Sequence, residues 1–454
     1  MTPTPRTPKA PKQIRSRPAS AGPTASVAEA LAKITPARAA AFEILTRVGE
    51  NKGHSDELLH SSHTTALTPE DRNLATALVM GVLRWQIALD ARLAKLLARP
   101  DQRLAEPVAL ALRLGAFQLL HMDRIPAHAV LNESVELCRA SGNPHAAGMV
   151  NAILRKLATA QKPGARIFES PAAFAERLAH PLWLVERWVA AYGREAALAI
   201  CEYDQHEPHS GSLFPPNESA SPEAMPQVDD GSRLVAELAA AALPFTAAAA
   251  PRVWDCCAAP GGKTLMLALR LPIAEILATD VSSKRLALTT TRLRQYPYAA
   301  RVRTEVADTT TPTATDPIFD LILCDVPCSG TGTLARNPEI RLRLRPEDLT
   351  RQAARQHAIL AGAIHRLAPG GRIVYSTCSL EPEENEQVAD AVASAAGLRR
   401  LPVEPFLANL AAAGILTPEI AATLTASAIA ANALRTLPGV HPCDGFFAAV
   451  FERN

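Results

Sequence analysis

Residues 252–280 read RVWDCCAAPGGKTLMLALRLPIAEILATD, and their pattern decides the fold class of this part of the chain. A short apolar run ends at Asp255, a glycine-containing turn follows, a helical pattern begins near Gly262, and a second apolar run ends at Asp280. A strand, a turn, a helix and a further strand in this order are typical of two parallel strands joined by a helical crossover. The segment therefore predicts the beginning of an α/β sheet.

The turn of this unit, CAAPGGKT from Cys257 to Thr264, has two possible chemical meanings. A phosphate-binding loop of the Walker type needs a glycine, four residues, then Gly-Lys-Ser/Thr, and Cys257 stands where the first glycine is required. A glycine-rich turn between a strand and a helix also points helix N–H groups at any anion, so a carboxylate suits it as well as a phosphate. The turn alone leaves a P-loop NTPase open.

The alternation of short apolar runs with helical segments continues to the C-terminus. We predict strands over residues 252–257, 274–280, 301–308, 319–326, 370–377 and 445–453. Strands that are apolar without interruption are buried on both faces, which indicates a mostly parallel, doubly wound sheet. Ligands of such sheets bind at the carboxyl ends of the strands.

An acid ends each of three successive predicted strands: Asp280, Asp308 and Asp325. An acid after the second strand of such a fold typically binds ribose hydroxyls. A Walker NTPase would use the strand that ends at Asp325 for magnesium, but it has no need of Asp280 and Asp308. A single Asp at such a position is commonly a helix cap. Three Asp residues at the ends of three successive strands favour instead a nucleoside ligand that lies across the carboxyl edge of the sheet.

Two cysteines follow the next pair of predicted strands. Cys328 lies three residues after Asp325, and Cys378 directly follows the strand of residues 370–377. One such cysteine would most often be a small core residue. Because adjacent strand ends lie over one cleft, two thiols beside a cofactor site favour a role in chemistry.

The chain divides into four parts by composition and periodicity. Residues 1–35 predict a disordered basic tail, 36–160 an all-helical bundle, 161–245 a helical and loop-rich connector, and 246–454 the α/β domain. Residues 1–166 carry nine more basic than acidic side chains, which makes this half the better docking surface for a polyanion. A solvated surface of ordinary helices would explain the same charge.

Three segments carry a resemblance to a known family. DCCAAPGGKT (255–264), LCDVPCSGTGTLARNPEIRLR (323–343) and YSTCSLEPEENE (375–386) resemble the signature motifs of S-adenosylmethionine-dependent RNA cytosine-5 methyltransferases. Residues 113–137 and 149–158 are similar to the NusB-like RNA-binding domain of the ribosomal RNA small-subunit methyltransferase B (Sun/Fmu) family. The resemblance implies a multidomain protein: a NusB-like helical bundle followed by a Rossmann-like methyltransferase domain.

The family's site residues carry over to matching positions of this sequence. The resemblance implies that Cys378 is the nucleophile that adds to carbon 6 of cytosine and that Cys328 assists product release. DNA cytosine methyltransferases use the Pro-Cys thiol as the nucleophile, so an exchange of the two roles stays open. It implies that Asp280 binds the ribose of S-adenosylmethionine, Asp308 the adenine side, and that Asp325 lies near the sulfonium and the base. The methionine part would be held by Cys257, Ala258, Ala259, Pro260, Gly261, Gly262 and Lys263. No metal is expected.

Two further features concern RNA. A basic strip beside the Cys328 loop could bind the RNA backbone, and an ordinary solvated helix face is the alternative. The strip comprises Arg336, Arg341, Arg343, Arg345, Arg351 and Arg355. Where the family usually carries Leu-Arg-x-Asn, this chain keeps only Asn217, which puts local RNA or linker contacts in doubt. Ser232 resembles a residue at the edge of the cleft.

The sequence thus predicts a cytoplasmic monomer that methylates carbon 5 of a cytosine in 16S ribosomal RNA. The same reaction on transfer RNA or 23S RNA is one alternative, and a non-catalytic RNA-binding antitermination or assembly factor is another; the intact cysteines argue against the latter. We find no apolar run of membrane-helix length, and we expect no membrane association and no protein partner. The eight cysteines are expected to be free thiols.

Overall fold

The computed structural model describes residues 29–99, 103–160, 170–208, 211, 213–215, 225–244, 250–313 and 315–454. Two features that the sequence singles out, most of the predicted basic tail and Asn217, lie outside these residues. The chain forms two compact units, one made of residues 1–46, 62–78 and 93–162, the other of residues 47–61, 79–92 and 163–454.

The first unit is built from helices, as predicted. Thr68 begins the longest one by accepting a hydrogen bond from the backbone N–H of Asp71, and Pro69 occupies its first turn. Arg38 forms a buried ion pair with Glu133 at 2.9 Å, and its Nε donates to Gln118. The helices of this half of the chain, including those partly in the second unit, are α2 (Pro36–Gly49), α3 (Ser55–Leu59), α4 (Ser62–Thr65), α5 (Pro69–Ala94), α6 (Glu106–His121), α7 (Ala127–Ala140) and α8 (Ala147–Thr159).

Among the described residues, α5 is long and apolar enough to cross a membrane by length and composition alone, so the expectation of no apolar run of membrane-helix length is wrong. Its side chains at Leu78, Val79 and Val82 are fully buried, and Arg84 is only 7% exposed. A core helix of a soluble protein meets the same two criteria, and a buried arginine in the middle of α5 suits that role.

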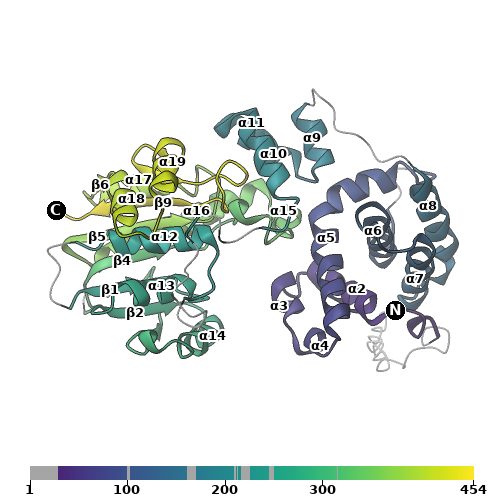
Figure 1. The fold of residues 1–454 in the computed structure, drawn as a ribbon, viewed down its shortest axis with the longest axis horizontal. Helices are drawn as coiled ribbons and strands as arrows, with labels where there is room; N and C mark the ends of the chain where they lie inside the picture. The colour runs from purple at the N-terminus through teal and green to yellow at the C-terminus, as the bar shows by residue number, and fades with distance from the viewer. Residues whose placement is uncertain are drawn as a thin grey trace, which may run out of the picture. The chain divides into compact units, whose positions relative to one another are not determined.

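The second unit contains one sheet of nine strands in the order β3-β2-β1-β4-β5-β9-β8-β7, with β6 paired to β9 (Figure 1). Strands β1 to β5 are parallel, and β9 runs antiparallel to β5. The strands are β1 (Arg252–Asp255), β2 (Glu275–Asp280), β3 (Arg303–Val306), β4 (Phe319–Asp325), β5 (Leu367–Thr377), β6 (Arg399–Leu401), β7 (Ile429–Ala430), β8 (Ala433–Arg435) and β9 (Phe447–Glu452). The chain order reverses between β1 and β4, which is where sheets of this kind bind ligands.

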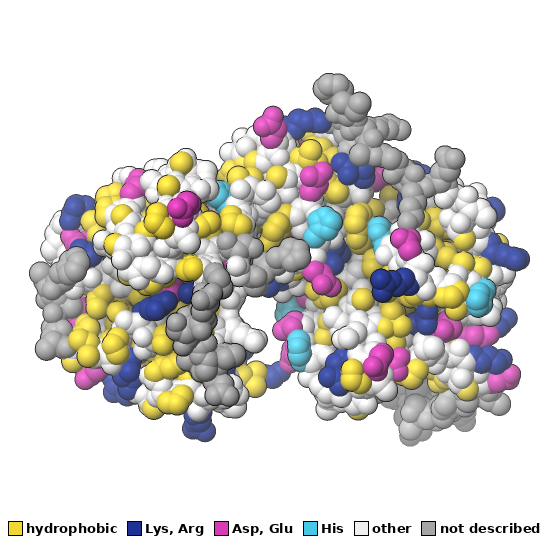
Figure 2. Space-filling model, in the orientation of Figure 1, with side chains coloured by type: hydrophobic (Ala, Val, Ile, Leu, Met, Phe, Trp, Pro, Cys, Tyr) yellow, Lys and Arg dark blue, Asp and Glu magenta, His cyan; other side chains and the backbone are white. Residues whose placement is uncertain are grey.

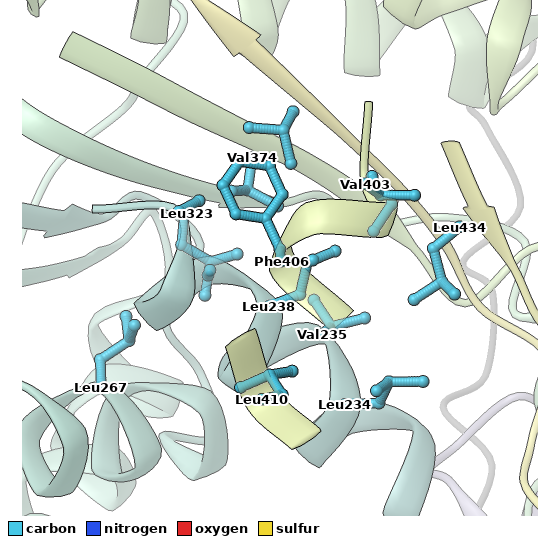
Figure 3. Packing of buried hydrophobic residues seen from close by; sticks show 14 of the residues in the cluster. Leu234, Val235, Leu238, Leu267, Leu323, Val374, Val403, Phe406, Leu410 and Leu434 are labelled. Atoms are coloured by element: carbon cyan, nitrogen blue, oxygen red, sulfur yellow. The ribbon is translucent and has the colours of Figure 1, made fainter. Parts of the chain in front are cut away.

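Helices cover both faces of this sheet. On one face Val253, Leu323 and Val374 pack against helices α12, α13, α18 and α19. Figure 3 shows Leu323 and Val374 beside labelled residues of α12, α13 and α18. On the other, the alternate strand residues Trp254 and Ile322 pack against α16 and α17. Each fully buried Leu or Val of these layers contributes about 1.5–3 kcal/mol. The bounds are α12 (Asp230–Ala241), α13 (Gly262–Arg270), α14 (Ser283–Leu293), α15 (Ile340–Arg343), α16 (Pro346–His365), α17 (Glu386–Ala395), α18 (Glu404–Ala412) and α19 (Pro418–Ser427).

The doubly wound α/β prediction is confirmed, and a strand overlaps each of the six predicted ranges, although β5 begins at Leu367, before the predicted range 370–377. The structure adds β6, β7 and β8 and the helices α18 and α19, which the sequence analysis does not predict. These strands are two or three residues long, too short for a periodic pattern to be read. The connector forms α9 (Pro171–Arg177), α10 (Leu182–Tyr192) and α11 (Arg194–Tyr203).

Candidate active site

The turn from Cys257 to Lys263 connects β1 to α13 at the carboxyl end of the sheet. Gly261 begins α13 with a φ of +92°, a backbone conformation that side-chain-bearing residues rarely adopt. A Cβ on Gly261 would also lie 2.9 Å from the Thr289 side chain. Asp255, at the end of β1, is held beneath the turn because the Thr264 hydroxyl donates to it at 2.7 Å. The glycine thus lets the backbone approach a ligand.

The three predicted acids lie along one cleft. A cavity of about 300 Å³ is lined by Asp280, Asp308 and Asp325 together with Cys257, Cys328 and Cys378. The Asp280 carboxylate accepts a hydrogen bond from the backbone N–H of Ser282, which fixes its orientation. Asp308 accepts from the hydroxyl and the backbone N–H of Thr310, and these bonds lower the pKa of its carboxyl. The acids and both thiols therefore open into one space.

Lys263 lies next to the thiol end of this cleft. Its Nζ forms an ion pair with Asp325 at 2.7 Å and donates to the Ser232 hydroxyl at 3.2 Å. Burial opposes the charge of Lys263, but the carboxylates of Asp325 and Asp229 outweigh it and raise its pKa. The Cys378 thiol is close enough to add to this electrostatic effect. Lys263 therefore remains a cation beside Cys378.

The two thiols are in contact. The sulfur atoms of Cys328 and Cys378 lie 3.3 Å apart, and both side chains are partly buried. Contact with Cys378 is the largest cause of a Cys328 pKa raised well above its usual range, followed by burial and by the nearby Glu384 carboxylate. The Cys328 thiol therefore holds its proton more strongly than an ordinary cysteine does.

One buried carboxylate ties the two cysteine-bearing loops together. Glu384 is 0% exposed, and its Oε1 accepts from the Ser329 backbone N–H at 2.8 Å and from Gln356 at 2.9 Å. Its Oε2 accepts from the hydroxyls of Ser329 and Ser379. Since Ser329 follows Cys328 and Ser379 follows Cys378, the position of each thiol depends on Glu384.

Comparison with known proteins supplies the family. Residues 245–452 match the family model described as 16S rRNA methyltransferase RsmB/F, and residues 35–159 match that of the NusB family. The ribosomal RNA small subunit methyltransferase B of Xanthomonas campestris is 32% identical over 93% of this chain and 98% of its own length. That of Vibrio vulnificus is 30% identical over 92% of this chain and 99% of its own length.

The chain belongs to the ribosomal RNA small-subunit methyltransferase B family. It is therefore an S-adenosylmethionine-dependent RNA cytosine-5 methyltransferase with a NusB-type N-terminal domain, as its motifs predict. A structural likeness extends over most of the chain: the crystal structure of PH0851 covers 92% of this chain with a TM-score of 0.69, at 20% identity. At that identity the likeness concerns the fold.

Several residues of this methyltransferase site are absent from the sequence analysis. Asp255 ends β1 just as Asp280 ends β2, so the same strand-end signal could have found it. It is 1% exposed, and burial raises its pKa to about 7. Glu384 lies within the third family motif. Its hydrogen bonds to the Cys328 loop and to the Cys378 loop depend on tertiary contacts, which the sequence does not show. Ile359 of α16 also lines the cavity and is not singled out by the sequence, whereas Arg355, which lines it as well, is a member of the predicted basic strip.

The predicted basic strip is wrong as a continuous surface. Arg341 is only 2% exposed, and burial lowers its pKa to about 10. Its guanidinium donates to the backbone carbonyls of Ala179, Asp204 and Leu334. Arg336 is paired with the buried Asp444. Only Arg345, Arg351 and Arg355 of the six are exposed. On the face seen in Figure 2, basic and acidic side chains are interspersed.

Gly362 allows α16 to pack directly on the loop that carries Asp308, and its replacement provides a test of this contact. A Cβ at Gly362 would lie 1.9 Å from the Thr309 carbonyl oxygen. We expect Gly362→Ala to lower the free energy of unfolding by about 1–3 kcal/mol. It should also weaken S-adenosylmethionine binding, because the Thr309 loop lines the cleft. Thermal unfolding and titration calorimetry measure the two effects.

The matched control is Gly148→Ala, because a Cβ at this helical glycine meets nothing within 4 Å. We expect that change to be neutral or slightly stabilising. Unchanged cofactor affinity in Gly362→Ala would show that the Thr309 loop does not shape the binding site.

Proposed function

We propose that this enzyme transfers a methyl group from S-adenosylmethionine to carbon 5 of a cytosine in 16S ribosomal RNA through a covalent Cys378 adduct. The observation that carries the proposal is the 3.3 Å contact between the Cys328 and Cys378 sulfur atoms beside the ion pair of Lys263 and Asp325. The substrate is inferred from the relatives, which are named as small-subunit rRNA methyltransferases.

The fit of S-adenosylmethionine to the cleft is supported by the chemistry of its lining. Asp280 offers an oriented carboxylate suited to ribose hydroxyls, and Asp308 offers a second one at the end of the neighbouring strand. The Gly261 turn gives close backbone approach for the methionine part, which we assign to residues 257–263. Asp255 adds a buried oxygen, Oδ1, without a hydrogen-bond partner, and it lines the adjoining cavity of about 160 Å³.

The first chemical step is the addition of the Cys378 thiolate to carbon 6 of the base. Carbon 5 of cytosine is a poor nucleophile, and bond formation at carbon 6 converts the ring into an enamine that can attack an electrophile. The Lys263 cation lies near Cys378, while the raised pKa of Cys328 keeps the second thiol neutral. This difference supports Cys378 as the nucleophile over the reverse assignment.

S-adenosylmethionine, held by Asp280, Asp308 and residues 257–263, would supply an electrophilic methyl carbon for carbon 5 and would leave as S-adenosylhomocysteine. Release then requires removal of the carbon 5 proton and expulsion of the Cys378 thiolate from carbon 6. Once Cys378 is bonded to the base, the contact that raises the Cys328 pKa no longer involves a thiolate. Cys328 can then release its own proton to water and, as a thiolate, accept the carbon 5 proton.

We assign the two domains to different tasks. Residues 36–160 would dock the ribosomal RNA and residues 246–454 would carry out the transfer, with 161–245 as the connector and 1–35 as a tail. A base in a stacked helix cannot reach Cys378, so the target is a cytosine that is single-stranded or flipped out. The enzyme would act as a monomer in the cytoplasm.

The test uses the purified full-length chain, tritiated S-adenosylmethionine and unmodified 16S, 23S and transfer RNA transcripts. We expect label in 16S RNA alone, recovered as 5-methylcytidine after digestion. Asp280→Asn should raise the Kd for S-adenosylmethionine about tenfold or more, because a charged acceptor of the ribose hydroxyls is lost. Glu305→Gln, an exposed acid on β3, is the matched control.

Label in transfer RNA or 23S RNA instead would reassign the substrate. Cofactor binding without transfer to any of the three RNAs would favour the non-catalytic RNA-binding factor.

A further inference from the structure

The connector helix α10 binds the loop that follows Cys378. Trp188 Nε1 donates to Glu381 Oε1 at 3.0 Å, and Arg187 Nε donates to Glu381 Oε2 at 2.7 Å. The Tyr192 hydroxyl donates to the backbone carbonyl of Leu380. Three side chains from one face of α10 thus hold two consecutive residues that lie two and three positions beyond the thiol.

These contacts are buried. The side chain of Glu381 is 1% exposed, Trp188 is fully buried, and the Tyr192 contact is partly buried. Burial raises the pKa of Glu381, and the hydrogen bonds from Arg187 and Trp188 act in the opposite direction. Buried carboxylates are costly unless their lone pairs are satisfied, so the loop conformation depends on the donors of α10.

The held residues are connected to Cys378 by short hydrogen bonds. The Leu380 backbone N–H donates to Thr331 in the Cys328 loop at 2.9 Å, and the Gly332 N–H donates to the Cys378 carbonyl at 2.9 Å. Leu380 and Leu334 also pack into the apolar cluster of the connector helices. Both cysteine loops therefore rest on α10 and its neighbours rather than on the sheet alone.

We propose that α10 is a positioning element for the nucleophile, and that Arg187, Trp188 and Tyr192 set the distance of Cys378 from Lys263 and from Cys328. This inference rests on the proposed function, because it takes Cys378 as the reacting thiol. The connector would then contribute to catalysis by positioning Cys378, a contribution that comes neither from the NusB-type segment nor from the methyltransferase segment. A displaced loop would leave the Cys378 thiolate without its neighbouring cation.

The experiment deletes hydrogen-bond donors while keeping an aromatic ring at each position. We compare the full-length wild type with Trp188→Phe, Tyr192→Phe and the double variant, measuring the rate of iodoacetamide alkylation of the Cys378 peptide against pH. We expect the double variant to alkylate Cys378 about tenfold more slowly near neutral pH, with the midpoint of the profile moved upward. The kcat for methyl transfer should fall about tenfold, with the Kd for S-adenosylmethionine within about twofold of the wild type.

Arg187→Met and Arg187→Lys form a second pair. Methionine keeps the chain length without a donor, whereas lysine can still donate to Glu381, so lysine should restore most of the alkylation rate that methionine loses. Arg194→Met on α11 is the matched control, because Arg194 lies over the Phe174 ring of the connector. We expect a wild-type alkylation profile for this control.

A wild-type profile and kcat in the folded double variant would overturn the positioning role. The positioning role would also be overturned if the double variant lost kcat and bound S-adenosylmethionine more weakly by the same factor. That pattern would indicate general destabilisation of the site. Alkylation does not require RNA. A wild-type chain that methylates no RNA would therefore overturn the proposed function, while a shifted Cys378 profile would still support the role of α10.

Discussion

Cys378→Ala is expected to abolish methyl transfer, by about 10⁴-fold or more, and to prevent any covalent complex with RNA. Without a thiolate at carbon 6 the cytosine ring is not activated, and no neighbouring group can replace that bond. Cys328→Ala is expected to leave the addition and the methyl transfer intact but to slow release, so a covalent protein–RNA complex should accumulate. Both are measured together with tritiated S-adenosylmethionine, 16S RNA and denaturing gels.

The control for this pair is Cys138→Ala, a buried cysteine of α7 in the helical unit, which should keep wild-type transfer. An adduct trapped in Cys378→Ala and lost in Cys328→Ala would make Cys328 the nucleophile. Transfer that survives in both variants would exclude the thiol mechanism altogether.

Glu384→Ala is expected to give the second largest effect, a loss of transfer of at least about 100-fold with about 3–5 kcal/mol of lost stability. Removing the carboxylate leaves the Ser329 N–H, the Gln356 amide and two serine hydroxyls buried without their acceptor. Both thiol-bearing loops are then free to shift, and small displacements of reacting groups cost large factors in rate.

Glu384→Gln tests whether the hydrogen bonds of this side chain, rather than its negative charge, hold the two loops. A glutamine can keep its oxygen toward Ser329 N–H and Gln356 while its amide donates to the hydroxyls, so transfer should fall much less than in the alanine variant. Glu347→Gln, an exposed acid in the first turn of α16, is the control. Transfer rates and thermal unfolding measure the series, and a folded Glu384→Ala variant with wild-type transfer would contradict the loop-coupling role.

Much of the fold and part of the site could be predicted from local pattern. The alternation of apolar runs with helical segments predicts six strands, and a strand of the structure overlaps each predicted range, because unbroken apolar strands must be covered on both faces. Asp280, Asp308 and Asp325 were predicted to share a cleft since parallel strands end at one edge of a sheet, and all three line one cavity. The periodicity did not indicate the two- and three-residue strands β6 to β8.

The arginine residues mark the limit of local pattern. From the sequence, Arg341 and Arg345 are both basic residues of one strip, but the structure buries the first among backbone carbonyls and leaves the second exposed. Which arginine is buried depends on the segments that fold over it, in this case residues near Ala179 and Asp204, which are far away along the chain. Charge counts therefore overestimated the surface offered to RNA.

The sequence by itself determined the fold class, the family and the identity of the two thiols and three acids, because each depends on residue type and on spacing along the chain. Only the tertiary structure decided that Cys328 and Cys378 touch, that Lys263 pairs with Asp325, and that Glu384 joins the two loops. These contacts join strands β1, β4 and β5 and the segments that follow them, and their distances are set by how the sheet and its helices pack. Packing of distant segments, unlike periodicity, leaves no pattern in a local stretch of sequence.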